Sequence, residues 1–253
     1  MGTPRGFGID IGGSGIKGCL VDLEKGALAA DRIRIDTPQP STPDAIADVV
    51  KDIVKEFGWE GPIGITLPCV VKKGVALTAA NIDKKWIDTD AAALFADRLG
   101  RDAGQVTVLN DADAAGMAEM RYGLGAGRDG VVVLLTFGTG IGSALFHDGK
   151  LVPNTEFGHL EVDGHDAEKR AAASVKDDKN LSWSEWAHRV SKYLRTLEGL
   201  IWPDLVIAGG GVSKKADHWL PLLDVRTEVV AAALKNDAGI VGAAAAATEG
   251  IGH

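Results

Sequence analysis

The chain of 253 residues contains only two cysteines and no long apolar run. Both cysteines, Cys19 and Cys69, lie inside apolar stretches, so we expect buried thiols and neither a disulfide nor a metal-binding pair. No uninterrupted apolar stretch reaches the roughly 20 residues that a membrane-spanning helix needs. The first residues lead into a glycine-rich strand and lack the basic and apolar regions of a secretion signal. These absences predict a cytoplasmic protein without a membrane partner.

A basic excess is also missing, since the formal net charge at pH 7 is -8. General nucleic-acid-binding proteins are strongly basic, so we expect no nucleic-acid partner. Exposed charges are largely screened beyond about 8 Å at physiological ionic strength. A local basic groove can therefore outweigh a distant acidic excess, and the net charge does not exclude a polyanionic substrate.

Glycine is abundant, and two glycine-rich segments share one pattern. Gly8–Val21 and Leu134–Leu145 each contain a β-rich run, a turn of Gly, Ser or Thr, and a second β-rich run. Glycines let backbone N–H groups approach an anion without interference from a Cβ atom. Two such hairpins predict a duplicated phosphate clamp.

The first hairpin also contains Gly13–Gly18, which matches the G-x-G-x-x-G pattern of dinucleotide-binding proteins. In those proteins the pattern opens a helix, whereas the following residues Cys19–Val21 favour a strand. We therefore interpret the segment as a phosphate hairpin with Asp10 at its entry. Since Mg²⁺ keeps several waters, Asp10 could hold a hydrated Mg²⁺ against phosphate oxygens; the alternative is a carboxylate that caps the turn.

Buried strands are predicted at residues 62–67, 106–109, 131–135 and 205–208, and each ends in a polar or glycine-rich loop. Helices are predicted after Thr42, after the capping box at Ser182, and in the alanine-rich end. Ligands of α/β sheets bind at the carboxyl ends of strands. On the Ser182 helix, Arg189, Lys192 and Arg195 share one face, which we interpret as solvated, with an anion-binding stripe as the alternative.

Two polar clusters carry candidate chemistry. Asn110–Asp113 stands where a strand ends and a helix begins, and it holds more polar side chains than an N-cap requires. A carboxylate there can accept the proton of an attacking hydroxyl. The second cluster contains Glu156 and His159, with Glu168 on a following helix. These side chains suit the hydroxyl groups of a sugar, although a lone histidine is more often structural.

The segments 10–17, 110–113, 137–142, 156–159 and 208–211 occur in the order found in the ROK family of sugar kinases, which this chain resembles over nearly its whole length. Within that family, segments 81–86, 153–161 and 201–205 look like those of actinobacterial polyphosphate glucokinases. The resemblance implies an α/β fold of the actin-like ATPase (ribonuclease H-like) type, with duplicated domains and an active-site cleft between them. We expect domains at residues 1–109 and 110–253, with a final helix at about 238–249 that packs back on the first domain.

The resemblance also implies roles for single residues. Asp111 matches the catalytic base that takes the proton of the sugar 6-hydroxyl. Sugar contacts are implied for Asn110, Glu156, His159 and Glu168, with Asn81 as a further candidate and Glu161 as the fallback for Glu168. The implied donor-binding residues are Asp10, Gly12, Gly13, Ser14, Gly15, Lys17, Thr136, Gly138, Thr139, Gly140, Gly209, Gly210 and Gly211.

Two departures from the family pattern are informative. Many members follow the Gly-His pair with a C-x-C-G-x-x-G-C zinc cluster, but Val162–Arg170 here contains no cysteine, so we expect no structural zinc. The repressors of the family carry an N-terminal helix-turn-helix, whereas this chain starts at the first hairpin strand.

We therefore expect an Mg²⁺-dependent kinase that transfers a phosphoryl group from inorganic polyphosphate to the 6-hydroxyl of glucose, giving glucose 6-phosphate. ATP as a further donor, mannose as a further acceptor and the preferred polyphosphate length stay open, and a homodimer is the family habit. The alternatives are a strictly ATP-dependent glucokinase and a non-catalytic sugar-sensing protein. Cations for a polyphosphate groove would come from Lys84, Lys85, Lys176, Lys179, Lys192, Arg195, Lys214 and Lys215.

Overall fold

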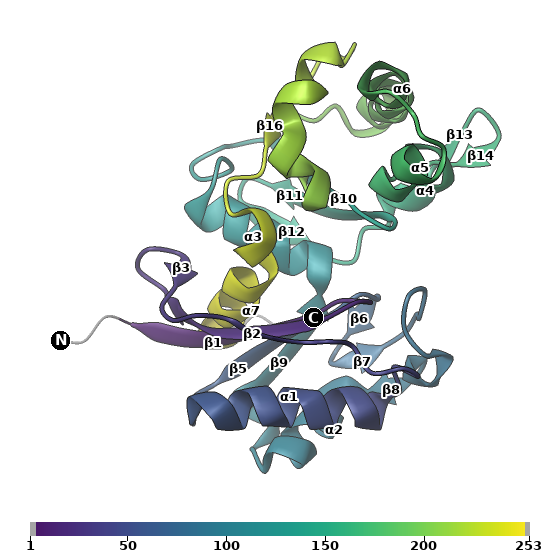
Figure 1. Cartoon of the computed structure of the whole chain (residues 1–253). Helices are drawn as coiled ribbons and strands as arrows, with labels where there is room; N and C mark the ends of the chain where they lie inside the picture. Colours follow the sequence, from purple (N-terminus) through teal and green to yellow (C-terminus); the bar gives the residue numbers. More distant parts are fainter. Residues whose placement is uncertain (1–3, 251–253) are drawn as a thin grey trace. The chain divides into compact units, whose positions relative to one another are not determined.

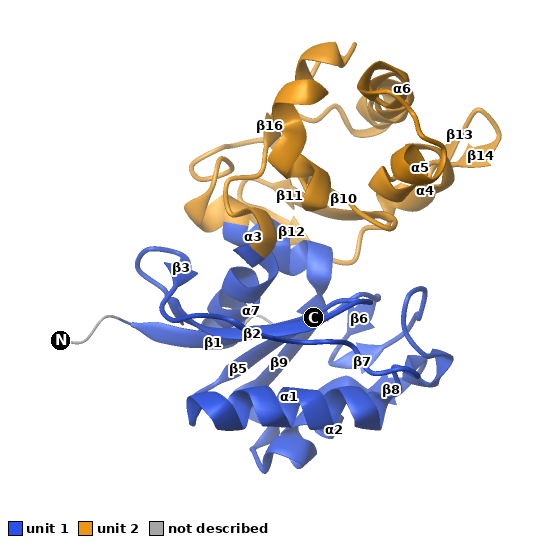
Figure 2. Ribbon diagram, in the orientation of Figure 1, with its two compact units in different colours: residues 1–118, 237–253 blue, residues 119–236 orange. Residues whose placement is uncertain are grey.

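The computed structural model describes residues 4–250, which fall into two compact units (Figure 2). Unit 1 comprises residues 1–118 and 237–253, and unit 2 comprises residues 119–236. The division expected after residue 109 therefore lies instead after residue 118. The reason is that α3 (Asp111–Tyr122) follows β9 (Val106–Asn110) without a loop, and Ala114 packs in one apolar cluster with Leu109 and Ala243 of unit 1.

The main sheet of unit 1 has the order β3-β2-β1-β5-β9, and β4 also pairs with β2. Its strands are β1 (Arg5–Ile11), β2 (Ile16–Asp22), β3 (Ala27–Leu28), β4 (Ile33–Ile35), β5 (Ile63–Leu67) and β9. Strand β1 pairs antiparallel with β2 and parallel with β5, and β5 pairs parallel with β9. The carboxyl ends of β1, β5 and β9 therefore meet at one edge of the sheet.

Helices cover both faces of this sheet (Figure 1): α1 (Pro43–Phe57) and α2 (Ala91–Leu99) lie on one face, and α7 (Ala238–Glu249) lies on the other. As predicted from the sequence, Thr42 begins α1, because its side chain accepts a hydrogen bond from the Ala45 amide. Gly58 ends the helix with a left-handed φ of 57°. The apolar face of α1 packs on β1 and β2 in one core with Phe7.

Glycines let α7 lie directly on the sheet. A Cβ atom at Gly8 would stand 1.9 Å from the Ile240 carbonyl oxygen, and one at Gly64 would stand 1.8 Å from the Ala243 carbonyl oxygen. Both distances are far below van der Waals contact, so only glycine fits at these positions. The close approach explains why a helix at the end of the sequence belongs to unit 1.

Unit 2 repeats the arrangement, with a sheet of order β12-β11-β10-β15-β16. Its strands are β10 (Val131–Phe137), β11 (Ile141–His147), β12 (Lys150–Val152), β15 (Leu205–Gly209) and β16 (Glu228–Ala231). Strand β10 pairs antiparallel with β11 and parallel with β15, as β1 does with β2 and β5. Each predicted glycine-rich segment is thus a β-hairpin, and it forms the antiparallel part of a mixed sheet.

The helices of unit 2 are α4 (Glu168–Ala171), α5 (Ala173–Asp178) and α6 (Trp183–Ile201). The predicted capping box begins α6, where Ser182 and Glu185 exchange hydrogen bonds. Trp186 of this helix is fully buried and makes edge-to-face contacts with Phe137 and Trp219. The sheet and α6 therefore share one aromatic core.

The remaining elements are short: β6 (Val71–Lys72), β7 (Val75–Ala76), β8 (Thr89–Asp90), β13 (Glu161–Val162), β14 (His165–Asp166), and the 3₁₀ segments η1 (Lys84–Trp86), η2 (Ala103–Gln105), η3 (Phe157–His159), η4 (Gly211–His218), η5 (Leu220–Leu222) and η6 (Lys235–Asp237). Among residues 4–250, every helix falls short of the length and apolarity that crossing a bilayer requires.

Candidate active site

The turn of the first hairpin presents backbone N–H groups. Within the turn, the Gly12 amide donates to the Gly15 carbonyl at 3.0 Å. Two carbonyl groups of the turn accept hydrogen bonds from side chains outside it. Thr37 Oγ1 donates to the Gly12 carbonyl at 2.5 Å, and Arg34 donates to the Ser14 carbonyl at 2.9 Å. The amides of residues 13 and 14 have no acceptor among residues 4–250. Such paired amides suit an anion.

The second hairpin repeats this organisation. The Gly138 amide donates to the Gly140 carbonyl at 3.0 Å. Ser174, at the start of α5, donates from its amide to the Gly138 carbonyl and from its hydroxyl to the Thr139 carbonyl, at 3.0 and 2.8 Å. The amides of residues 139 and 140 have no acceptor in the described part of the chain. Each turn therefore offers two adjacent amides to an anion, although the first turn is one residue longer than the second.

Asp10 lies at the end of β1, with its side chain 17% exposed. Lys17, its cross-strand neighbour, forms an ion pair with Oδ2 at 3.1 Å, and the Thr66 hydroxyl donates to Oδ1 at 3.1 Å. No turn amide donates to Asp10 among the described residues, so the turn-capping alternative gains no support. Gly239, in the first turn of α7, is adjacent, since a Cβ atom there would stand 2.9 Å from Oδ1.

Asn110, not either aspartate, caps α3. Its Oδ1 accepts from the amides of Ala112 and Asp113 at 2.8 and 3.1 Å, and its Nδ2 donates to the Cys69 carbonyl at 3.0 Å. Asp113 is fully buried, whereas Asp111 is partly exposed and accepts from the Ala112 amide at 2.8 Å. Of these two aspartates, only Asp111 therefore has exposed surface.

Asn81 lies beside the first hairpin turn. Its side chain is exposed, and its backbone oxygen and Cβ stand 3.6 and 3.9 Å from the place a Cβ of Gly13 would take. This position puts Asn81 next to the amides of unit 1 that are predicted to bind phosphate.

In unit 2, the predicted sugar-binding side chains gather around one carboxylate, that of Asp166 in β14. His159 Nδ1 lies 3.1 Å from Asp166 Oδ2, and the Glu168 amide donates to Asp166 Oδ1 at 3.1 Å. Glu156 Oε2 lies 4.0 Å from His159 Nε2. The structure therefore brings Glu156, His159 and Glu168 together. Asp166 was missed, and its only sequence signal is its place in the short acidic segment between His159 and Glu168.

Glycine positions this cluster against the second hairpin. A Cβ atom at Gly158 would stand 2.1 Å from the Ile141 carbonyl, and one at Gly140 would stand 2.4 Å from Glu168 Oε2. Glu168 Oε2 also accepts a hydrogen bond from the Ile141 amide at 3.3 Å. The side chain of Glu161, the fallback for Glu168, has no hydrogen bond or ion pair within the described residues, so the geometry favours Glu168.

The charges of the cluster shift its acid–base behaviour. The hydrogen bond to Asp166 raises the pKa of His159, which is the largest cause of that shift. Partial removal of water raises the pKa of Glu156, and the negative charge of Glu168 raises it further. His159 is therefore favoured as a protonated hydrogen-bond donor.

Metal binding is a further possibility to test for this cluster. Single ligand atoms of His159, Asp166 and Glu168 lie within 4.8 Å of one another. The hydrogen bonds to Asp166 already account for that grouping without an ion. Both cysteines, Cys19 and Cys69, are buried in unit 1, away from this segment in the chain. The absence of a structural zinc stays a prediction.

A cavity of about 360 Å³ opens at the carboxyl ends of β10 and β15. Its walls include Gly138 of the second hairpin, Ser174 and Lys176 of α5, Trp183 of α6, and Gly211 and Lys215 of η4. We call it the donor cavity. The Lys176 ammonium lies 4.2 Å above the Trp183 ring.

Gly210 shapes the wall of the donor cavity. Its φ of 80° and ψ of -178° belong to a region that is essentially restricted to glycine. A Cβ atom there would also stand 2.3 Å from the Phe137 carbonyl. The segment Gly209–Gly211 can therefore run beside the second hairpin only with glycine at its centre.

Of the predicted groove cations, Lys176 and Lys215 line the donor cavity. Arg195 instead pairs with Asp224 at 2.5 Å on the exposed side of α6, as expected for a solvated helix face. Lys84 and Lys85 belong to η1 in unit 1.

The chain resembles known sugar kinases over nearly its full length. The profile described as ROK family matches residues 6–178. A polyphosphate glucokinase of Mycobacterium tuberculosis (strain CDC 1551 / Oshkosh) is 59% identical over 251 residues, which cover 98% of this chain and 93% of the relative.

Two solved structures are similar as well. The crystal structure of the inorganic polyphosphate/ATP-glucomannokinase of Arthrobacter sp. strain KM has a TM-score of 0.92 and 51% identity, and the match covers 97% of this chain and 98% of that chain. The ROK family glucokinase of Streptomyces griseus, solved with glucose and AMPPNP, has a TM-score of 0.82 and 26% identity, with 97% and 100% coverage.

Proposed function

This chain belongs to the ROK family, and from that premise we propose that it transfers the terminal phosphoryl group of inorganic polyphosphate to the 6-hydroxyl of glucose, yielding glucose 6-phosphate. The fold is of the actin-like ATPase type, with the hairpin-led sheet present in both units. One observation supports the binding of a phosphate donor. In both hairpin turns, carbonyl groups accept hydrogen bonds from other residues of the same unit, while two adjacent amides have no acceptor among residues 4–250.

Asp111 is the proposed general base. It accepts the proton of the 6-hydroxyl while the sugar oxygen bonds to the terminal phosphorus and the bridging P–O bond of the donor breaks. The leaving group is polyphosphate shortened by one unit. The partial exposure of Asp111 and its fixed position at the start of α3 support this role.

Glu156, His159 and Glu168 are the proposed contacts to the other sugar hydroxyls. The carboxylates accept hydrogen bonds, and protonated His159 donates one. Asn110 has one remaining N–H for the sugar, because its oxygen and its other N–H are used by the α3 cap and by Cys69. Asn81, beside the first turn, is retained as a further candidate.

The proposed donor contacts are the amides of both turns, Lys17, Thr136 and the segment Gly209–Gly211. ATP is proposed as a further donor. This is supported by the donor cavity, which Trp183 and Gly211 both line and whose volume lies in the range of small-molecule sites. Mannose is proposed as a further acceptor, supported by the similarity to a glucomannokinase.

Asp10 fits the role of holding a hydrated Mg²⁺. A carboxylate offers about four lone pairs, and Lys17 and Thr66 use only part of this capacity. When bound, Mg²⁺ would neutralise charge on the phosphate oxygens. The cytoplasmic location and the homodimer stay predictions.

The decisive experiment compares glucose 6-phosphate formation from long-chain polyphosphate and from ATP at matched Mg²⁺. We expect turnover with polyphosphate. Turnover with ATP alone would identify a strictly ATP-dependent glucokinase, and glucose binding without turnover from either donor would identify a sugar sensor.

A further inference from the structure

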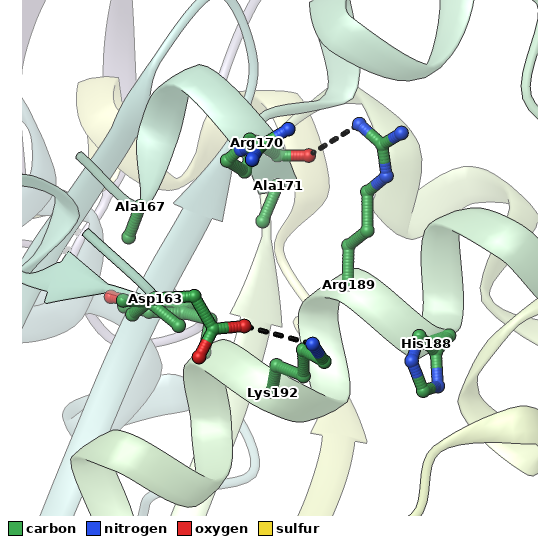
Figure 3. A pocket seen from close by; sticks show the side chains of 9 residues that line it. Asp163, Ala167, Arg170, Ala171, His188, Arg189 and Lys192 are labelled. Carbon is green, nitrogen blue, oxygen red and sulfur yellow. Dashed lines mark hydrogen bonds and ion pairs between the residues drawn. The ribbon is translucent and has the colours of Figure 1, made fainter. Parts of the chain in front are cut away.

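A second cavity in unit 2, of about 230 Å³, lies between α4, α6 and the turn that joins β13 to β14 (Figure 3). We call it the α4–α6 cavity. Its charged and polar walls are Asp163, Arg170, His188, Arg189, Lys192 and Tyr193. None of these residues belongs to the sugar cluster or to the hairpin turns described above.

Positive charge dominates the α4–α6 cavity. Lys192 pairs with Asp163 at 2.8 Å, which cancels one charge of each sign. In the described part of the chain, Arg189 donates only to the carbonyl oxygen of Arg170, at 3.5 Å; Figure 3 draws this contact. Within residues 4–250, neither Arg170 nor Arg189 forms an ion pair with a carboxylate. Two guanidinium groups thus remain for an external anion, and their planar geometry suits phosphate oxygens.

Tyr193 also lines the cavity and carries an unsatisfied polar group. Its side chain is 1% exposed, and its hydroxyl has no hydrogen-bond partner among the described residues. A buried hydroxyl without a partner is costly. Burial also raises the pKa of Tyr193, so the hydroxyl stays neutral and able to donate.

The α4–α6 cavity adjoins the donor cavity along the chain. Ala171 lines the α4–α6 cavity and Ala173 lines the donor cavity. Two residues span at most about 7 Å, so the two cavities flank the short joint between α4 and α5. A linear anion that ends at the second hairpin would have to pass this joint to reach the α4–α6 cavity.

We propose that the α4–α6 cavity binds phosphate groups of the polyphosphate chain beyond those held in the donor cavity, chiefly through Arg170 and Arg189. This inference rests on the polyphosphate donor of the proposed function. The sequence left open that the cations of α6 bind an anion. The proposal assigns that role to Arg189 and not to Arg195.

The test is a double variant, Arg170→Gln with Arg189→Gln, together with the single variant Arg189→Gln, for which Arg195→Gln is the matched loss of one charge on α6. We expect the KM for long-chain polyphosphate to rise about tenfold in the double variant. The KM values for ATP and glucose should stay unchanged, and the KM for tripolyphosphate should change less than that for long chains, because the proposal assigns the α4–α6 cavity to phosphates beyond those held in the donor cavity. Arg195→Gln should behave as the unmodified protein. If the double variant fails to fold, the KM for long-chain polyphosphate is measured in the two single variants instead.

Direct binding separates this proposal from the proposed function. Calorimetry without glucose should show weaker binding of long-chain polyphosphate to the double variant, even if the unmodified protein made no glucose 6-phosphate. Unchanged binding and unchanged KM for long chains would overturn the proposal. A further outcome would also overturn the proposal. Orthophosphate could bind in the cavity of the unmodified protein while the double variant keeps an unchanged KM for long-chain polyphosphate.

Discussion

At the start of α3, two neighbouring residues divide structural and chemical tasks. Asn110 caps the helix with its oxygen and ties β9 to the Cys69 carbonyl with its amide group. Asp111 is left partly exposed, whereas Asp113 is fully buried. Substitution at Asp111 should therefore change chemistry without removing the helix cap.

Asp111→Asn should lower kcat by about 10²–10⁴, the usual contribution of a general base. The KM for glucose should change little, and the thermal midpoint should stay near that of the unmodified protein because Asn110 still caps α3. Steady-state kinetics measure the first two quantities. Asp97→Asn, an exposed acid on α2, is the control. Near-normal turnover in Asp111→Asn would remove Asp111 from the proposed mechanism.

The hydrogen bond to Asp166 raises the pKa of His159, so its loss should show in pH profiles. Asp166→Asn should lower the pKa of His159, because the hydrogen bond to Asp166 is the main cause of the raised value. The alkaline limb of kcat/KM for glucose should move to lower pH, and an NMR titration of His159 should show the same shift. Asp178→Asn, exposed on α5, is the control. An unmoved limb would exclude protonated His159 as a glucose contact.

The same pair predicts a pH-dependent stability difference. A raised histidine pKa stabilises the folded protein fully below the ordinary histidine pKa of about 6.5. That contribution is lost as the pH rises through the folded-state value. The difference in unfolding free energy between the unmodified protein and Asp166→Asn should therefore be largest in acid. It should be small, since the His159 side chain is 52% exposed.

At the scale of elements, the contact between α7 and the sheet depends on glycines, which have no side chain. Gly64→Ala should destabilise unit 1 by about 1–3 kcal/mol, because its Cβ would overlap the Ala243 carbonyl and force the helix outward. The urea midpoint of unfolding measures the effect. Gly104→Ala is the matched control, since no atom lies within 4 Å of its Cβ position. Equal midpoints would mean that α7 adapts without cost.

The two hairpins show how much of an element its own sequence specifies. Their strands, turns and donor-facing amides were predicted from local patterns of glycine and β-branched residues, and the structure confirms both hairpins. The partners that hold the turns were not predicted. Thr37 and Ser174 lie 25 and 35 residues from the carbonyls of Gly12 and Thr139 that they bind. Local patterns carry no information about such distant contacts.

At the scale of the molecule, the chain leaves unit 1 at residue 118 and returns at residue 237. A chain that ends at residue 236 would lose α7 and expose one face of the main sheet of unit 1. We expect such a chain to lose cooperative unfolding of unit 1, measured by circular dichroism. A chain that ends at Gly250 keeps α7 whole and is the control. A native-like transition in the shorter chain would show that α7 is dispensable.

The sequence by itself determined the hairpins, the main helices with their caps, and the chemical kinds of the candidate residues. These depend on residues close together in the chain: glycine patterns, helical spacing, and the Thr42 and Ser182 caps. The place of Asp111 after a strand was readable for the same reason.

Only the tertiary structure decided which side chains meet. It joined Asp10 to Thr66 across 56 residues, placed α7 on β1 and β5, and made Asp166 the partner of both His159 and Glu168. It also separated Arg189 at the α4–α6 cavity from Arg195 on the same helix. These outcomes depend on how distant segments pack and on which charges find partners, and spacing along the chain specifies neither.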